Sequence, residues 1–418
     1  MGIYTLAQNN DPIYQQALAT TLANFESKKQ ARALLLPDVT LSANTLSNKQ
    51  TNKGVFIQQQ SNETIQFNSH GYSLNIVQPL FRWDRYLNLK QADAVLTQTE
   101  SEQLLAQQDL IIRVAENYFN ILTAMENLKL AQAVKKSLTK QLEQTQQQFN
   151  VGLVAITDLH EAQAGFDIAV ADEILNKNLL DNAHIDMREI TNEYITKISG
   201  LADNLALTYP QPNDIEQWSK MAETQNINVI IAKKKLEIAA KEIEKQQAKH
   251  LPAVDLVANH GRQASGGRFG TNKAQTSSIG LELNINLFQG GLVSAEVNQA
   301  RHLYNLAFHE LTQSLRASRK EARQAYLRIL SGISRVHALK QSVISSVAAL
   351  DATKIGAEIG TRTTVDVVRS ERVALDAKSE YARSKYIYLL DGLHLKKASG
   401  SLNINDLVQV NQILAKDI

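Results

Sequence analysis

Cysteine is absent from this chain of 418 residues, and its absence removes several kinds of chemistry at once. The chain can form no disulfide, bind no metal through thiolates and use no thiol nucleophile. It also offers no cysteine to which a lipid could be attached. We therefore expect neither a disulfide scaffold nor a lipid-anchored protein.

Proline is nearly as scarce, with six residues in the whole chain. They are grouped so that 80–209 and 253–418 contain none, and glycine is missing from 72–151. A helix can continue through such segments because it loses no intrahelical hydrogen bond to proline. The two proline-free segments therefore predict helices much longer than those of ordinary globular domains.

Long apolar runs and an excess of one charge are missing too. No segment approaches the ~18 apolar residues of a membrane-spanning helix. Basic and acidic residues nearly balance, 44 against 42, and are interleaved, which argues against nucleic acid as a partner. Residues 1–8 lack the apolar core of a signal peptide. The chain is therefore either cytosolic or a mature form whose signal peptide has been removed.

What the chain does contain is an internal duplication. Residues 36–44 read Leu-Pro-Asp-Val-Thr-Leu-Ser-Ala-Asn, and residues 251–259 read Leu-Pro-Ala-Val-Asp-Leu-Val-Ala-Asn. We infer two tandem copies of the same elements, residues 1–208 and 209–418.

Each copy contains a region in which apolar and polar residues alternate strictly. The alternation runs through 72–76 and 279–287, and a weaker one precedes each in the same copy. It predicts four strands of about ten residues, each with one apolar and one polar face. They form two hairpins whose polar connections, 45–71 and 260–278, are expected to be exposed loops. Two interpretations stay open: a small soluble sheet with one wet face, or part of a membrane β-barrel with its apolar face outward.

Most of the remaining sequence has the heptad periodicity of helices. In 84–149, one apolar seam passes through Leu104 and Ile111, and a second passes through Leu105 and Ile112. Two adjacent seams indicate a helix that packs on both flanks, as in a ring or cylinder of helices. The second copy repeats the pattern.

A glycine-containing turn follows each long helix. The turns lie near 149–152 and 357–360, where glycine suits the left-handed conformation that often ends helices. Return helices are expected over 156–198 and 362–399. Each copy is thus predicted as helix, strand, strand, very long helix, turn, helix.

Three motifs in the chain carry a resemblance, and the first and third of them are specific. They are Gln-Phe-Asn-Val-Gly-Leu-Val-Ala-Ile-Thr-Asp-Leu at 148–159, His-Leu-Pro-Ala-Val-Asp-Leu at 250–256 and Gly-Thr-Arg-Thr-Thr-Val-Asp-Val at 360–367. They resemble the TolC family, the outer-membrane exit ducts of Gram-negative bacteria. The similarity extends over essentially the whole chain, from about residue 3 to residue 415.

The resemblance implies a mainly α protein with a membrane β-barrel. In a homotrimer, three copies of the four strands would close one twelve-stranded barrel in the outer membrane, and the helices would continue it as a periplasmic α-helical barrel. The barrel hairpins, with their extracellular loops, would be residues 37–81 and 251–288. The helical barrel would consist of 12–36, 82–198, 215–250 and 289–399, with coiled-coil tips near 145–165 and 353–373. The equatorial segments would be 1–11, 199–214 and 400–418.

The implied function is passive, gated exit across the periplasm and outer membrane. The duct would dock to a periplasmic adaptor and to an inner-membrane transporter of the RND or ABC type, in tripartite efflux, type I secretion or both. No cofactor and no metal is expected, and the signal peptide would already be removed. The strands point the same way, because open sheet edges are not tolerated in lipid and a four-stranded protomer cannot close a barrel alone.

Strand alternation assigns side chains to lipid or to water. The residues expected to face lipid are Leu74, Ile76, Leu281, Leu283 and Ile285. Those expected to face water are Asn75, Glu282, Asn284 and Asn286. An aromatic belt at the membrane surface is expected where strands meet helices, with junction packing as the alternative. Its residues are Phe81, Trp83, Tyr86 and Phe288.

The resemblance also implies a latch at the turns. Arg362, after the second turn, would bind Thr157 and Asp158 after the first, with Gln141 of a neighbouring helix as a further partner. Hydrated contacts of this kind contribute about 0–1 kcal/mol each, which suits a latch that another protein releases. The family's latch tyrosine corresponds to Ala357, so a weaker latch is expected. A surface ion pair without consequence is the alternative.

The pore constriction of the family carries two acidic residues three positions apart. Here the first is Asp366 and the second position is Arg369, and such residues share a helix face. In a trimer the three acidic and three basic side chains would cancel. We therefore expect weaker cation selectivity, and weaker block by multivalent cations, than in relatives with two acids.

Two other functions compete with this interpretation. Against an enzyme, the histidines show no HExxH or HxH pairing, and a glycine-rich phosphate loop is missing. A periplasmic adaptor or structural coiled-coil protein would share the long helical hairpins, but it would need soluble β-domains at its ends. RNA binding by Arg262 and Arg268, in the glycine-rich segment 261–270, is disfavoured by its expected position at a loop tip.

Overall fold

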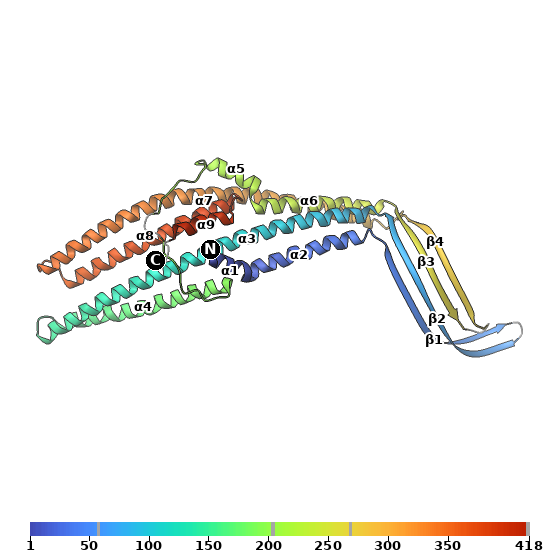
Figure 1. Cartoon of the computed structure of the whole chain (residues 1–418), viewed down its shortest axis with the longest axis horizontal. Helices are drawn as coiled ribbons and strands as arrows, with labels where there is room; N and C mark the ends of the chain where they lie inside the picture. The colour runs from blue at the N-terminus through green and yellow to red at the C-terminus, as the bar shows by residue number, and fades with distance from the viewer. Residues whose placement is uncertain (57–58, 202–204, 267–269, 415–418) are drawn as a thin grey trace. The chain divides into compact units, whose positions relative to one another are not determined.

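The computed structural model describes residues 1–56, 59–201, 205–266 and 270–414, which form long helices and one antiparallel sheet (Figure 1). The helices are α1 Gly2–Asn10, α2 Pro12–Ala33, α3 Trp83–Asn150, α4 Ile156–Thr191, α5 Ile215–Gln225, α6 Ile227–Gln247, the 3-10 turn η1 Ala248–His250, α7 Leu292–Glu358, α8 Thr364–Ala398 and α9 Ile404–Ile413. The strands are β1 Asp38–Phe56, β2 Gln59–Phe81, β3 Ala253–Ser265 and β4 Asn272–Asn284. Within these described residues, no helix is both long enough and apolar enough to span a membrane.

The chain divides into two compact units. The hairpin unit consists of Met1–Thr20, Glu100–Ala232 and Leu311–Ile418, and the sheet unit consists of Thr21–Thr99 and Lys233–Glu310. Helices α2, α3, α6 and α7 each contribute residues to both units.

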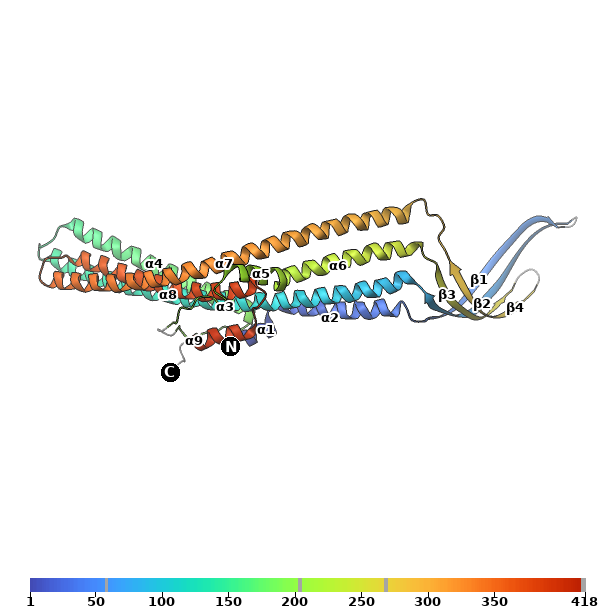
Figure 2. The same ribbon diagram turned by 90° about the horizontal axis from the view of Figure 1, so that it is seen from above.

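In the sheet unit, the strands lie in the order β1-β2-β3-β4 and every neighbouring pair is antiparallel. Its helices form one layer in the matching order α2, α3, α6, α7 (Figure 2). Polar contacts join α2 to α3, α3 to α6, and the turn η1 after α6 to α7. They are Lys28–Asp93 at 2.5 Å, Gln91–Glu242 at 2.8 Å and Lys249–Glu296 at 2.7 Å.

The strands are longer than the sequence predicted, and the expected loops 45–71 and 260–278 are largely strand. β1 has 19 residues and β2 has 23, and β1 pairs with β2 from Asp38 through Phe56. The prediction was wrong because it relied on apolar alternation, which stops in these polar segments. Pairing depends instead on backbone groups of a partner strand, and these do not require apolar side chains.

The hairpin unit contains two antiparallel helix pairs, α3 with α4 and α7 with α8 (Figure 1). Lys135 contacts Glu173 at 2.8 Å in the first pair, and Arg328 contacts Asp391 at 3.0 Å in the second. The apolar core of the unit draws on both pairs and on α1, α5 and α9. Its fully buried members include Leu110, Ile111, Ile121, Met187 and Leu395.

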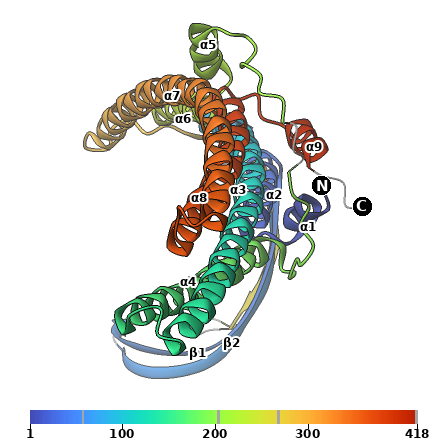
Figure 3. The same cartoon turned by 90° about the vertical axis from the view of Figure 1, so that its left-hand side faces the viewer.

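The predicted equatorial segments contain the short helices α1 and α9, which lie beside each other near the two chain ends (Figure 3). The Met1 ammonium donates to Asn411 Oδ1 at 3.0 Å. Leu201 of the middle segment forms a β-bridge with Leu414. All three equatorial segments therefore meet within the hairpin unit.

The return helix predicted over 156–198 ends earlier, at Thr191. Asn192 has φ 58° and its amide donates to the carbonyl of Arg188, which is the left-handed cap that ends a helix. The prediction was too long because asparagine is a weaker stop signal than glycine or proline, and neither occurs in 193–198.

Candidate functional site

The strand register collects the apolar side chains on one face of the sheet. Leu41 lies opposite Leu74, and Leu256 lies opposite Leu281. Residues that face each other across antiparallel strands share a face, as do alternate residues along one strand. By this rule Leu74, Ile76, Leu281 and Leu283 share the face that we call the outer face.

The opposite face, which we call the inner face, is polar in this part of the sheet. Asn75, Glu282 and Asn284 lie on it. Asn259 donates a hydrogen bond to Asn75 across strands β2 and β3. The sheet therefore has an apolar outer face and a polar inner face.

Ile285 lies outside the strand to which the sequence assigned it. β4 ends at Asn284, whose partner is Ala253, the first residue of β3. No residue of β3 remains to pair with Ile285, so the strand stops there despite continued alternation in the sequence. Asn286 lies beyond the strand for the same reason.

The four predicted belt aromatics are exposed around the junctions between strands and helices. Phe81 ends β2, and Trp83 begins α3 and stacks on Tyr86 with 5.0 Å between ring centroids. Phe288, in the segment between β4 and α7, is 87% exposed. Exposed rings at these positions can contact lipid or water around the protein, and they contribute little to the protein's own core.

An ion pair fixes the base of the sheet. The Arg82 side chain donates to both carboxylate oxygens of Asp255, at 3.0 and 2.5 Å, and joins the start of α3 to β3. Arg85 donates to the carbonyl of Leu34 at 2.8 Å. The first contact ties the first copy's strand–helix junction to the second copy's first strand, and the second ties that junction to the segment after α2.

The two helix turns have the same geometry, as the duplication predicts. Gly152 has φ 76° and Gly360 has φ 79°. The amide of Leu153 donates to the carbonyl of Gln148, and that of Thr361 donates to the carbonyl of Gly356, both at 2.8 Å. This six-residue pattern closes the last helical turn and requires the left-handed glycine.

Carboxylates cap the two return helices. Asp158 accepts from the amide of Ala155 at 3.2 Å. Asp366 accepts from the amide of Thr363 at 3.0 Å and from its hydroxyl at 2.9 Å, while the amide of Asp366 donates back to that hydroxyl at 3.1 Å. The capping box at α8 was not predicted from the sequence, although Thr followed three residues later by Asp is a local signal for one.

Hydrogen bonds from Thr363 hold the pKa of Asp366 below its usual value, first through the backbone amide and then through the hydroxyl, with smaller contributions from the charges of Arg362 and Arg369. Asp366 is therefore an anion at neutral pH, and part of its hydrogen-bonding capacity is committed to capping α8. The Arg369 side chain, one turn further along α8, is exposed.

Within one chain, the latch residues are not joined. Among the contacts of the described residues, no hydrogen bond or ion pair connects Arg362 with Thr157 or Asp158. Arg362, Thr157 and Asp158 are all exposed, whereas Gln141 is 9% exposed. The first three side chains are thus accessible to another chain, and Gln141 lies within its own protomer.

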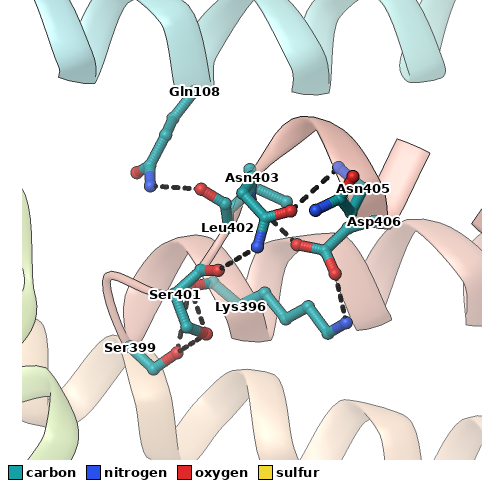
Figure 4. Close-up of polar contacts among 8 residues, drawn as sticks. All are labelled: Gln108, Lys396, Ser399, Ser401, Leu402, Asn403, Asn405 and Asp406. Atoms are coloured by element: carbon teal, nitrogen blue, oxygen red, sulfur yellow. Dashed lines mark hydrogen bonds and ion pairs between the residues drawn. The ribbon is translucent and has the colours of Figure 1, made fainter. Parts of the chain in front are cut away.

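A network of hydrogen bonds and one ion pair connects the end of α8 to α9 (Figure 4). Lys396 contacts Asp406 at 2.5 Å, and the Gln108 amide donates to the carbonyl of Leu402 at 2.8 Å. Gly400, with φ 77°, passes so close to the α5–α6 junction that an added Cβ would lie 2.0 Å from the carbonyl oxygen of Gln225. Sequence reasoning did not find this corner, because its partners come from distant parts of the chain.

No group of histidine and carboxylate side chains in the described part of the chain has an arrangement suited to a metal ion. The sheet and the helix turns instead present side chains suited to non-covalent contacts. One face is apolar, the other is polar, and charged or hydroxyl side chains lie at the helix turns.

Comparison with known proteins gives consistent matches along the chain. The family model described as outer membrane efflux protein matches residues 3–193 and 218–401. Outer membrane protein TolC of Escherichia coli (strain K12) is 33% identical over an alignment of 431 residues that covers 100% of this chain and 85% of the relative. Alkaline protease secretion protein AprF of Pseudomonas aeruginosa is 27% identical over 412 residues, covering 97% of this chain and 85% of the relative.

Solved structures show the same fold. The outer membrane channel CmeC of Campylobacter jejuni has a TM-score of 0.83 at 18% identity, covering 98% of this chain and 88% of that one. The outer membrane protein VceC of Vibrio cholerae has a TM-score of 0.75 at 18% identity, covering 96% of each chain.

Proposed function

Because the chain belongs to the outer membrane efflux protein family, we propose that three copies of it form a passive, gated duct across the periplasm and outer membrane. The predicted resemblance to TolC, the mainly helical fold and the outer-membrane location are confirmed. The family is one of outer membrane channels and not of enzymes, and we extend this to a chain without catalytic activity.

The observation that carries the proposal is the four-stranded sheet with one apolar and one polar face. β1 and β4 are edge strands within the described sheet, and lipid cannot satisfy the free backbone groups of such edges. Three copies joined edge to edge make a closed barrel that removes them. In that barrel Leu74, Ile76, Leu281 and Leu283 face lipid, and the polar inner face lines water.

Partners follow from the same proposal. A passive duct needs an energised pump, so we propose docking to a periplasmic adaptor and to an inner-membrane transporter of the RND or ABC type. The protease secretion proteins AprF and PrtF, at 27% identity each, support type I secretion as one use. Outer membrane protein TolC of Vibrio cholerae serotype O1, at 33% identity, supports the outer-membrane location, and the CmeC and VceC channels support the fold.

Purified protein and a complementation assay test this function together. We expect a detergent-solubilised trimer that conducts ions in planar bilayers and restores resistance to efflux substrates in a bacterium that lacks its own duct. A monomer that stays in solution without detergent would instead support the alternative, a periplasmic adaptor or structural coiled-coil protein.

The latch is proposed to form between copies. Arg362 is exposed, the contacts of the described residues include none that joins it to Thr157 or Asp158 of its own chain, and all three residues lie beside the turns. We place Arg362 of one copy against the Thr157-Asp158 pair of the next, with Gln141 supporting the helix that carries the turn. Ala357 offers no hydroxyl to this contact, so the latch depends mainly on the arginine.

Replacing Arg362 by serine is therefore expected to raise the resting conductance of the trimer in planar bilayers. The change removes the positive charge that holds the two turns together. Lys354→Ser, which also removes a positive charge near the second turn, serves as the matched control and should leave the resting conductance near that of wild type. Equal conductance of Arg362→Ser and wild type would remove Arg362 from the gate.

Asp366 and Arg369 are proposed to line the narrowest point of the pore. They lie in the first turns of α8, and three copies of each would give adjacent rings of opposite sign. Because the charges cancel, a cation gains little there, and a trivalent cation has no dense negative ring in which to lodge.

Changing Arg369 to aspartate is expected to create strong block by trivalent cations and to raise the preference for cations. Two unit charges about 4 Å apart interact by about 1–4 kcal/mol, depending on hydration, and reversing the sign of one charge changes this energy by twice that amount. Single-channel recordings with and without a trivalent cation measure the effect. The proposal fails if wild type is blocked as strongly as Arg369→Asp.

A further inference from the structure

The β1–β2 hairpin extends beyond the rest of the sheet. The last rung shared by all four strands joins Leu46, Ser69, Ser265 and Asn272. Beyond it, β1 and β2 pair only with each other, up to Phe56 and Gln59. We call the described residues beyond this rung, 47–56 and 59–68, the arm.

Apolar side chains change face at the base of the arm. In the sheet, Leu41, Tyr72 and Leu74 lie on the outer face, whereas Ile65 and Phe67 are an odd number of residues from Leu74 in the same strand. The register of β1 and β2 is uninterrupted there, so these two side chains lie on the inner face. Leu46, opposite Ser69, lies on the inner face as well.

The outer face of the arm is polar over the same stretch. Its described side chains are Ser47, Lys49, Thr51, Thr64, Gln66 and Asn68. The arm thus reverses the pattern of the sheet, in which the outer face is apolar. A reversal of this kind is expected where the outer face leaves lipid and meets water.

Burial follows the same alternation. Ile65 and Phe67 are half-buried, whereas Thr64, Gln66 and Asn68 are exposed. A Cβ added at Gly266 would lie 2.7 Å from Cβ of Phe67, so the Phe67 side chain leaves the sheet beside that glycine. Leu46 stays 54% exposed. The inner apolar surface is therefore only partly covered by its own chain.

We propose that Leu46, Ile65 and Phe67 of each copy pack against the arms of neighbouring copies and form an apolar collar at the outer mouth of the duct. This inference rests on the proposed trimer. If the outer face of the sheet meets lipid, the inner face points toward the axis of the assembly. The arms then rise from one rim with their apolar faces toward each other.

The collar is a second constriction that differs chemically from the one at the helix turns. From the shared rung outward, the described side chains on the inner face carry no charge: they are Leu46 and Ser69 of the rung, and Asn48, Gln50, Ile65 and Phe67 of the arm. An uncharged, apolar ring narrows a pore by excluding water rather than by selecting ions.

The absence of native cysteine allows a direct test by crosslinking. Ile65→Cys and Phe67→Cys place one thiol per chain on the inner face, and Gln66→Cys and Asn68→Cys place one on the outer face as matched controls. Full-length protein in outer-membrane vesicles is treated with a short bifunctional maleimide and separated on a denaturing gel. We expect the inner-face variants to shift largely from monomer to crosslinked species and the controls to stay monomeric.

Each thiol has a partner only in another copy, so the outcomes separate cleanly. Equal crosslinking of inner-face and outer-face variants, or no crosslinking of either inner-face variant in an intact trimer, overturns the collar. Protection of Phe67→Cys from a monofunctional maleimide without crosslinking means that its own chain covers the surface, and this also overturns the collar. Wild-type protein that is monomeric on a native gel overturns the proposed trimer itself.

Discussion

Replacing Arg113 by leucine is expected to destabilise the folded protein by about 3–5 kcal/mol, because it leaves a buried charge without its partner. The Asp11 side chain is 1% exposed and accepts two hydrogen bonds from Arg113, at 2.8 and 2.7 Å. It also accepts from the amide of Tyr14 at 2.8 Å. The pair thereby ties the α1–α2 junction to α3.

Denaturant unfolding of the purified protein measures this effect, and Arg335→Leu is the control. Arg335 contacts Glu380 at 3.4 Å with side chains 60% and 45% exposed, so its loss should cost only about 0–1 kcal/mol. The double variant Asp11→Leu/Arg113→Leu should recover most of the loss, because no buried charge remains unpaired. Equal destabilisation by the two arginine substitutions would contradict the assigned role of Asp11.

The same ion pair predicts a pH dependence. Burial alone would raise the pKa of Asp11, but hydrogen bonds from Arg113 and from the Tyr14 amide outweigh it and hold the pKa below the ordinary value. A lowered pKa contributes stability above the unfolded value of about 4, and that stability is lost as the pH falls through the folded pKa. The difference between wild type and Arg113→Leu should therefore shrink below about pH 4.

Replacing Gly400 by alanine is expected to cost about 3–5 kcal/mol, because two kinds of strain add at one residue. Gly400 has φ 77°, and an added Cβ would lie 2.0 Å from the carbonyl oxygen and 2.4 Å from the carbonyl carbon of Gln225. These are backbone atoms, so the α5–α6 junction itself would have to move. The corner that holds α8 to α9 would loosen as a result.

Substitutions at two other glycines distinguish the cost of the left-handed conformation from the cost of the steric clash. Gly360 has φ 79° with nothing within 4 Å of an added Cβ, so Gly360→Ala should cost only the left-handed conformation, about 1–2 kcal/mol. Gly392 lies within α8 with open space around it, so Gly392→Ala should stabilise by about 0.5–1 kcal/mol. Shifts of the unfolding midpoint measure all three. Equal losses at Gly400 and Gly360 would show that the close approach to Gln225 is not rigid.

Periodicity predicted the regular elements well where a local pattern decides them. The heptad seams through Leu104 and Leu105 lie within α3, and the alternation at 72–76 lies within β2. Residues 45–56 carry no such pattern and are nevertheless strand, because β2 supplies their backbone partners. Ile285 shows the converse, since its alternation continues but β3 has no residue left to pair with it.

The candidate site residues also differ in whether a local sequence pattern or a long-range contact reveals them. The family motifs predicted Arg362, Asp158 and Asp366 as site residues without any coordinates, because short turn motifs are local features of the sequence. The capping of α8 by Asp366 has a local signal in the Thr-x-x-Asp spacing, whereas the pairing of Asp11 with Arg113 and the contact of Gly400 with Gln225 involve geometry that no spacing rule supplies. The last two contacts join residues more than a hundred positions apart.

By itself, the sequence determined the duplication, the long helices, the two glycine turns and the family, since each depends on residues that are neighbours along the chain. Only the tertiary structure decided how far the strands run, which face each apolar side chain occupies, and which charges are buried. The physical reason is that a one-residue shift of register moves a side chain to the other face. The inner-facing Ile65 and Phe67 could therefore be recognised only once their strand partners were known.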